Sequence, residues 1–181
     1  MKYFSTRNNK LNEAFNTVLF QGLSKEGGLF LPKEWPQINI NDFKSNNYKE
    51  VALKVIYPFV KDEIPQDHLY EILNNTYDNF NHKKVAPLVK LDDNKHILEL
   101  FYGPTLAFKD YALQFLGNLF VYKLKRLDSK ITILGATSGD TGSAAINAFK
   151  GKKNINVFIL HPHNKVSDVQ RKQMTTVLED N

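Results

Sequence analysis

The feature that most constrains the fold is an apolar segment, a glycine-rich stretch, a helical segment and a second apolar segment, in that order. Residues 131–134 are apolar and β-branched and end at a glycine, which is typical of a buried parallel strand. Helical periodicity follows over 143–150, and residues 155–160 are the second apolar run. Strand, loop, helix and strand make one βαβ unit, so we predict an α/β fold with the beginning of a parallel sheet and flanking helices.

The remaining periodicities predict a small helical α/β unit over residues 1–84 and a second α/β region over residues 85–181. The expected strands are at 3–6, 87–91 and 96–100, and residues 26–32 are expected to form a turn into a short extended piece that a proline ends. Helices are expected at 11–20, 48–59, 66–75, 108–127 and 166–178. Two parallel strands with exposed faces would not be stable alone. We therefore expect the chain to be the N-terminal part of a longer protein, incomplete at its C-terminus.

Composition excludes several classes of function. The 181 residues include no cysteine, which rules out disulfides, thiolate metal sites and cysteine nucleophiles. The net charge of +5 comes from scattered basic residues without a nucleic-acid reader motif. No histidine spacing suggests a metal site, and no stretch is long enough to cross a bilayer. We predict a cytoplasmic protein without a metal, a nucleic-acid partner or a membrane partner, and leave its oligomeric state open.

The glycine-rich stretch is the first candidate for chemistry, because it follows a predicted strand and opens a helix. Ligands of open α/β sheets bind at such places, and the free N–H groups of a helix N-terminus favour negative charge. Thr137, Ser138 and Thr141 add hydroxyl groups, while Gly139 and Gly142 allow the backbone to approach a ligand. We predict a site for a carboxylate or a phosphate.

The glycine-rich stretch does not match either of two known nucleotide-binding motifs. A triphosphate loop needs a lysine after its last glycine, but Gly142 is followed by Ser143. The dinucleotide fingerprint fails because Gly135 and Gly139 are too far apart. Asp140 would repel an anion, so it either caps the helix or accepts a hydrogen bond from a ligand hydroxyl. A capped turn without a ligand remains an alternative.

Lys109 is the second candidate, a single amine in a mostly apolar run at the start of a predicted helix. Apolar surroundings and the helix dipole favour the neutral amine, which attacks aldehydes and transfers protons. A salt bridge involving Asp110 is the structural alternative. With the glycine-rich stretch downstream, Lys109 suggests Schiff-base chemistry on an anionic substrate.

Four stretches carry a resemblance over nearly the whole chain. They are Glu-Gly-Gly-Leu-Phe-Leu-Pro at 26–32, Glu-Leu-Phe-Tyr-Gly-Pro-Thr-Leu-Ala-Phe-Lys-Asp at 99–110, Gly-Ala-Thr-Ser-Gly-Asp-Thr-Gly-Ser-Ala-Ala at 135–145, and Val-Ser-Asp-Val-Gln at 166–170 running into Gln-Met-Thr-Thr at 173–176. In this order they resemble the threonine synthases, which are pyridoxal-phosphate enzymes of the tryptophan-synthase-β-like fold (PLP fold type II).

The resemblance implies that Lys109 carries pyridoxal 5'-phosphate as a Schiff base. It further implies that Thr137, Ser138, Gly139 and Thr141 grip the substrate's α-carboxylate. Asp140 matches a position that faces the cofactor's phenolic oxygen, where related enzymes often have asparagine. The residues that bind the cofactor's phosphate and pyridine nitrogen are expected beyond residue 181.

The implied reaction is that of a lyase in threonine biosynthesis, in which O-phospho-L-homoserine and water give L-threonine and phosphate. Lys109 would transfer the protons, and the 181 residues alone are expected to be inactive. His161 and Lys165 are weak candidates for holding the leaving phosphate, and for each of them an ordinary surface position is the favoured interpretation. The alternatives are a serine or threonine dehydratase of the same fold, and a truncated non-catalytic relative that acts as a binding domain.

Overall fold

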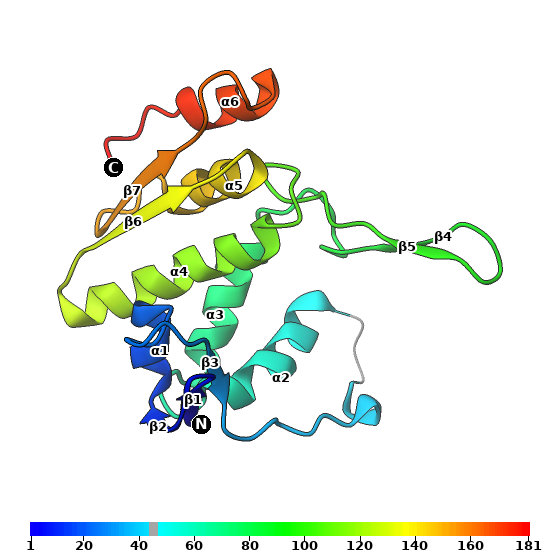
Figure 1. Cartoon of the computed structure of the whole chain (residues 1–181). Coiled ribbons are helices and arrows are strands. Elements are labelled where there is room, and N and C mark those ends of the chain that lie inside the picture. Colours follow the sequence, from blue (N-terminus) through cyan, green and yellow to red (C-terminus); the bar gives the residue numbers. More distant parts are fainter. Residues whose placement is uncertain (44–46) are drawn as a thin grey trace. The chain divides into compact units, whose positions relative to one another are not determined.

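The computed structural model describes residues 1–43 and 47–181 and is a mixed α/β structure (Figure 1). The chain divides into two compact units, Met1–Leu73 and Asn74–Asn181. Each unit is described by itself below. The domain boundary expected at residue 84 stays a prediction.

The first unit combines a three-stranded antiparallel sheet with helices. Its elements are β1 (Tyr3–Ser5), β2 (Asn8–Glu13), α1 (Phe15–Gln21), β3 (Phe30–Pro32), the 3₁₀ turn η1 (Ile40–Asp42), α2 (Tyr48–Val60) and the beginning of α3 (Gln66–Tyr77). The sheet order is β2-β1-β3. Ile64, Leu69 and Leu73 are fully buried in its core. The Tyr3 hydroxyl donates a hydrogen bond of 2.8 Å to the carbonyl of Phe59, at the end of α2.

The start of the first predicted helix is wrong. Residues 11–13 belong to β2, which pairs with β1 through the register Tyr3↔Glu13, and the helix begins only at Phe15. Leu11 and Phe15 are four residues apart, which fits a helix face. Pairing with β1 satisfies backbone groups that an isolated helical turn would leave unpaired, so the sheet determines the conformation of this segment.

The second unit contains the predicted βαβ arrangement. Its elements are the end of α3, β4 (Leu88–Lys90), β5 (His96–Leu98), α4 (Asp110–Leu127), β6 (Ile131–Ala136), α5 (Asp140–Phe149), β7 (Ile155–Leu160) and α6 (Asp168–Thr175). β4 and β5 form the predicted antiparallel hairpin. β6 and β7 are parallel, in a register that runs from Ile131↔Ile155 to Ala136↔Leu160. α5 packs against α4, α6 and β7, and Figure 1 shows it between the two helices.

In the second unit the starts of α4 and α5 also differ from the predicted ones. α4 begins at Asp110 instead of residue 108, so Lys109 is its N-cap residue. α5 begins at Asp140 instead of residue 143, because the carbonyl of Gly139 accepts hydrogen bonds from the amides of Gly142 and Ser143. The last predicted helix is also shorter, since α6 ends at Thr175. Asp140 therefore lies in the first helical turn, and the glycine-rich loop is shorter than expected.

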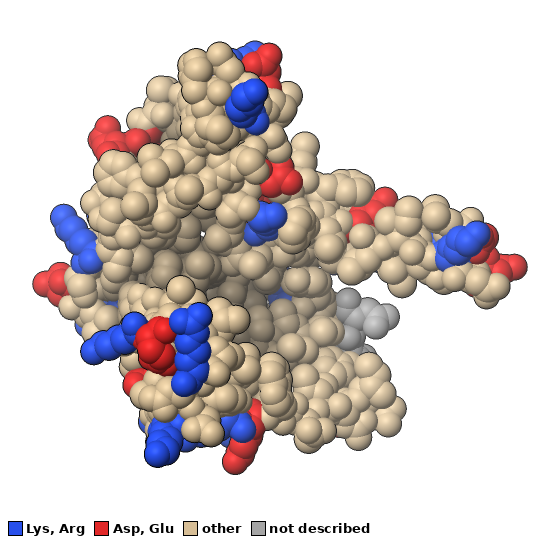
Figure 2. All heavy atoms as spheres, viewed as in Figure 1, with Lys and Arg blue, Asp and Glu red and all other residues tan. Residues whose placement is uncertain are grey.

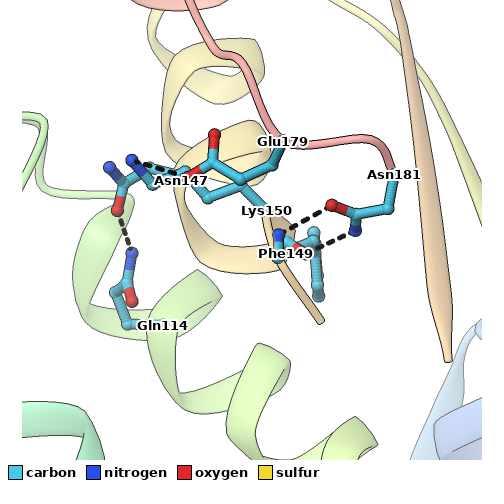
Figure 3. A network of polar contacts seen from close by, with 7 residues as sticks. Gln114, Asn147, Phe149, Lys150, Glu179 and Asn181 are labelled. Carbon is cyan, nitrogen blue, oxygen red and sulfur yellow. Dashed lines mark hydrogen bonds and ion pairs between the residues drawn. The ribbon is translucent and has the colours of Figure 1, made fainter. Parts of the chain in front are cut away.

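Asn181 closes the turn between α5 and β7 (Figure 3). Its amide nitrogen donates to the carbonyls of Phe149 and Ile155 at 2.9 and 2.7 Å, and its amide oxygen accepts from the N–H of Gly151 at 2.7 Å. Its backbone carbonyl accepts from Val157 of β7 at 2.9 Å. The segment after α6 thereby returns to the α5–β7 connection and fixes its conformation.

Candidate active site

The turn that precedes Lys109 is organised around a buried carboxylate. Asp110 is fully buried, and its two oxygens accept hydrogen bonds from the N–H of Thr105 at 2.7 Å and from the hydroxyl of Thr105 at 2.8 Å. A Cβ on Gly103 would lie 2.4 Å from the Cβ of Asp110, so only glycine fits there. Leu106 adopts a φ of +65°, a left-handed conformation that costs free energy in a leucine. The Asp110 side chain thus folds the chain back onto the start of α4.

Lys109 itself is half-buried at the N-cap position of α4. Its Nζ lies 4.2 Å from the centre of the Phe108 ring, a geometry that attracts a cation to the face of the ring. The carboxylate of Asp110 faces Thr105 instead, at the interior of the turn. The lysine amine therefore lies against an aromatic surface at the end of a helix.

Two residues upstream of this turn also interact. The Tyr102 hydroxyl donates a hydrogen bond of 2.7 Å to the carboxylate of Glu99, and this bond raises the pKa of Tyr102 above its usual value. The phenol is thereby kept in its protonated form as a donor. Both residues belong to the segment that leads from β5 to Lys109.

The loop between β6 and α5 is held by a hydroxyl group. The Oγ1 of Thr137 accepts hydrogen bonds from the amides of Gly139 and Gly142 at 3.1 and 3.2 Å. The amide of Thr137 donates to the carbonyl of Leu160 at 2.9 Å and so fastens the loop to the end of β7. A Cβ on Gly142 would lie 2.3 Å from the Cγ2 of Thr137. The Thr137 oxygen is thus occupied by the backbone, while its hydroxyl hydrogen can still be donated.

The same loop has backbone donors to offer a ligand. Ser138, Asp140 and Thr141 are exposed, and their N–H groups have no acceptor among the residues that the structure describes. They lie at the N-terminus of α5, where such groups favour an anion. The Asp140 carboxylate accepts a hydrogen bond from the side-chain amide of Gln170 on α6. The arrangement can therefore bind a carboxylate without leaving Asp140 unpaired.

The packing of α4 on α5 brings the two segments to the same end of the unit. The Gln114 amide donates to the side chain of Asn147 at 2.8 Å (Figure 3). One turn further along α4, a Cβ on Gly117 would lie 2.6 Å from the carbonyl of Ala148. Contacts that advance along both helices in the same direction place their N-termini together, and both helices begin on the right of Figure 1. Lys109 and Asp140 lie at these two N-termini.

A cavity of about 540 Å³ opens beside these segments but does not include Lys109 or Asp140. It is lined by Pro104, Thr105, Ser143, Asn147, Lys150, Gln173, Thr176, Val177, Leu178 and Glu179. Most of its polar groups come from α5 and from the segment that follows α6. It touches the lysine turn only at Pro104 and Thr105.

The two residues suggested for the leaving phosphate have different surroundings. His161 follows β7 directly, is half-buried, and its buried Nδ1 has no hydrogen-bond partner among residues 1–43 and 47–181. Lys165 is exposed in the loop that leads to α6. Within the same described residues, no group of three or more acidic or histidine side chains could hold a metal ion, and no helix is long and apolar enough to cross a membrane.

Gln170 and Gln173 contact this site, although no role was predicted for them from the sequence. Gln170 contacts Asp140, and the Gln173 amide donates to the carbonyl of Thr105 at 3.3 Å. Their spacing of three residues on one helix face was the available signal. It could not reveal which segments that face would meet.

Solved structures with the same fold are threonine synthases. PLP-bound threonine synthase from Brucella melitensis superposes with a TM-score of 0.91 at 47% identity, covering 97% of this chain and 38% of that one. Threonine synthase from yeast superposes with a TM-score of 0.92 at 42% identity, covering 98% of this chain and 38% of that one. The fold is therefore that of the N-terminal part of a fold-type-II pyridoxal-phosphate enzyme, as predicted.

Sequence comparisons lead to the same group. The family model described as "Threonine synthase N terminus" matches residues 2–77. Threonine synthase from Pseudomonas aeruginosa is 47% identical over 100% of this chain, which covers 39% of that relative. The chain is therefore similar over its whole length to the N-terminal part of threonine synthases. It spans about two fifths of the length of the curated relatives it matches, 39% and 38% for those from P. aeruginosa and Schizosaccharomyces pombe.

Proposed function

We propose that the protein is a threonine synthase, which converts O-phospho-L-homoserine and water to L-threonine and phosphate with pyridoxal 5'-phosphate as cofactor. The observation that carries the proposal is the common location of Lys109 and the glycine loop at the N-termini of two adjacent helices. Similarity to threonine synthases over the whole chain supports the choice of reaction.

The residues present fit pyridoxal phosphate. Its aldehyde needs a primary amine, and the half-buried Lys109 offers one beside an aromatic ring. Its phenolic oxygen needs a polar neighbour, and the exposed Asp140 carboxylate has one oxygen bonded to Gln170 and a second oxygen to offer. When bound, the cofactor supplies an electron sink for carbanion chemistry.

The side chains of the chain itself have separate roles in this proposal. Lys109 would hold the cofactor through its aldehyde group, with loss of water, and would move protons at its Nζ. The substrate's α-carboxylate binds to the free amides of the loop, to Thr137 through its hydroxyl hydrogen, and to the hydroxyls of Ser138 and Thr141. Gly139 lets the backbone approach that carboxylate closely.

O-Phospho-L-homoserine is thus the proposed small-molecule partner. A cytoplasmic location is part of the same proposal, supported by the biosynthetic role that the reaction implies. The absence of a nucleic-acid partner stays a prediction that follows from the scattered distribution of basic residues. Figure 2 shows blue and red groups interspersed on the face in view.

The test is an assay of threonine and phosphate release from O-phospho-L-homoserine by the protein at its natural full length. We expect Lys109→Ala to lose both the visible absorbance of lysine-bound cofactor and threonine formation. Lys130→Ala, which removes an exposed lysine of the same unit, should leave both unchanged. Activity on threonine alone would favour a dehydratase. A protein that stays colourless with added pyridoxal phosphate would favour a non-catalytic binding domain.

A further inference from the structure

Helix α6 carries two glutamines one turn apart, and each reaches a different segment of the candidate site. The side-chain amide of Gln170 donates to the carboxylate of Asp140, and that of Gln173 donates to the carbonyl of Thr105 at 3.3 Å. We propose that Gln170 and Gln173 are positioning residues that hold the glycine loop and the Lys109 turn at the spacing the reaction needs. This inference rests on the proposed function, because it assigns the two segments to one active site.

The orientation of the Gln170 amide is set by its own helix. Ser167 is the N-cap of α6, and its oxygen accepts from the backbone N–H of Gln170 at 3.4 Å. The Ser167 hydroxyl then donates to the Oε1 of Gln170 at 3.0 Å. Because an amide has one accepting and one donating end, this bond leaves Nε2 to donate towards Asp140. The Nε2 of Gln170 is therefore oriented towards Asp140 without the help of a ligand.

Gln170 also lies directly against the loop. A Cβ on Gly139 would be 2.7 Å from its Oε1, so the end of the Gln170 side chain lies directly over this glycine. The Ser143 hydroxyl of α5 is 3.5 Å from the backbone carbonyl of Gln170, a second and longer bond between the two helices. One Asp140 oxygen is thus held in place by α6, and the loop cannot move without disturbing this contact.

Gln173 acts on the other segment through Thr105. The carbonyl of Thr105 accepts from Gln173, while its N–H and hydroxyl both donate to the buried Asp110, the residue after Lys109. A shift of α6 would therefore be transmitted to both segments. A misplacement of about 1 Å costs on the order of a hundredfold in rate when catalytic groups must be aligned.

The experiment compares Gln170→Met and Gln173→Met with Gln114→Met, in the protein at its natural full length. Gln114 is a matched control, because its half-buried amide also donates to a side chain of the same unit, that of Asn147 at 2.8 Å. We expect kcat for threonine formation to fall about ten- to a hundredfold in the two α6 variants, the range for losing a hydrogen bond to a charged or tightly positioned group. KM for O-phospho-L-homoserine should change less, and Gln114→Met should keep the parent kcat.

Hydrogen exchange of the cofactor-free protein gives a readout that does not depend on activity. The amides of Gly139 and Gly142 are bonded to Thr137, and we expect them to exchange faster in Gln170→Met but not in Gln114→Met. If Gln170→Met does not fold, Gln170→Glu keeps the size and replaces the donor by a carboxylate opposite Asp140, with the same expected result.

The outcomes separate the two proposals. The positioning role alone would be overturned if both kcat and amide exchange were unchanged in the α6 variants. In that case the parent would still form threonine, and Lys109→Ala would still lose the cofactor absorbance and the activity. A different outcome is a parent protein that forms no threonine, while the loop amides of Gln170→Met exchange faster than those of the parent. That result would overturn the proposed reaction and support the contact between Gln170 and Asp140 as the determinant of loop position.

Discussion

The two segments of the candidate site are stabilised in opposite ways. The Lys109 turn is built around a fully buried carboxylate, Asp110, and includes a leucine in a left-handed conformation. The loop at the start of α5 is built around one hydroxyl, that of Thr137, and leaves its own carboxylate, Asp140, at the surface. The first arrangement fixes the residue next to Lys109, the side chain proposed to bind the cofactor. The second keeps backbone donors available to a ligand.

The comparison predicts that the carboxylate of the lysine turn matters most for stability. Asp110→Ala should lower the free energy of unfolding by roughly 3–6 kcal/mol, since hydrogen bonds to a charged acceptor contribute about 1.5–3 kcal/mol each and two are lost. Asp93→Ala removes an aspartate whose side chain is 94% exposed, and its effect should stay below about 1 kcal/mol. Urea denaturation of both variants measures the difference, and equal losses would contradict the role given to Asp110.

The next largest effect should come from packing in the glycine loop. In Gly142→Ala the new methyl group would lie 2.3 Å from the Cγ2 of Thr137 and 2.7 Å from the Sδ of Met174. Overpacking of this kind costs about 1–3 kcal/mol. Gly135→Ala is the control, because its methyl would meet only the end of the Ile159 side chain at 2.9 Å, which can rotate away. Thermal unfolding should show a clearly larger loss for Gly142→Ala, and the reverse order would exclude this account of the loop.

A smaller effect should follow from removing the hydroxyl that organises the loop. Thr137→Val keeps the shape of the side chain but leaves the amide of Gly139 without its acceptor, and that of Gly142 with only the carbonyl of Gly139. We expect a loss of about 1–2 kcal/mol in the free energy of unfolding. Thr141→Val at an exposed position should change it by less than about 0.5 kcal/mol. A Thr137→Val protein as stable as the parent would mean that solvent replaces this hydroxyl without cost.

The elements that the sequence predicted correctly are those with strong local periodicity. The strands β6 and β7, the long helix α4 and the β4–β5 hairpin were expected at nearly their observed positions. The conformation of residues 11–13 was not predictable in this way, because it depends on pairing with β1. The early start of α5 depends on Thr137 and on the packing of Gly142, which override the low helix propensity of glycine.

The candidate site residues were visible in the sequence, but the contacts that hold them were not. Lys109 and Asp140 stand out by their neighbours in the chain. Their supports, Gln170 and Gln173, lie 30 and 68 residues from the groups they bind, so no local pattern connects them. Contacts of this range follow only from the packing of α6 on α5.

The smallest expected effect tests the strain in the lysine turn. Leu106 is exposed and has a φ of +65°, so Leu106→Gly should relieve about 1–2 kcal/mol of conformational strain. Glycine also gains freedom in the unfolded chain, which offsets about 0.4–1 kcal/mol of that gain. We expect a net stabilisation on the order of 0.5 kcal/mol. Leu106→Ala is the control, because alanine keeps the Cβ and hence the strain. If both variants were stabilised equally, the backbone of the turn would hold no strain, and the gain would come from removing the exposed side chain. The gain from glycine alone would instead mean that the Lys109 turn maintains an unfavourable backbone conformation, which the loop at α5 does not need.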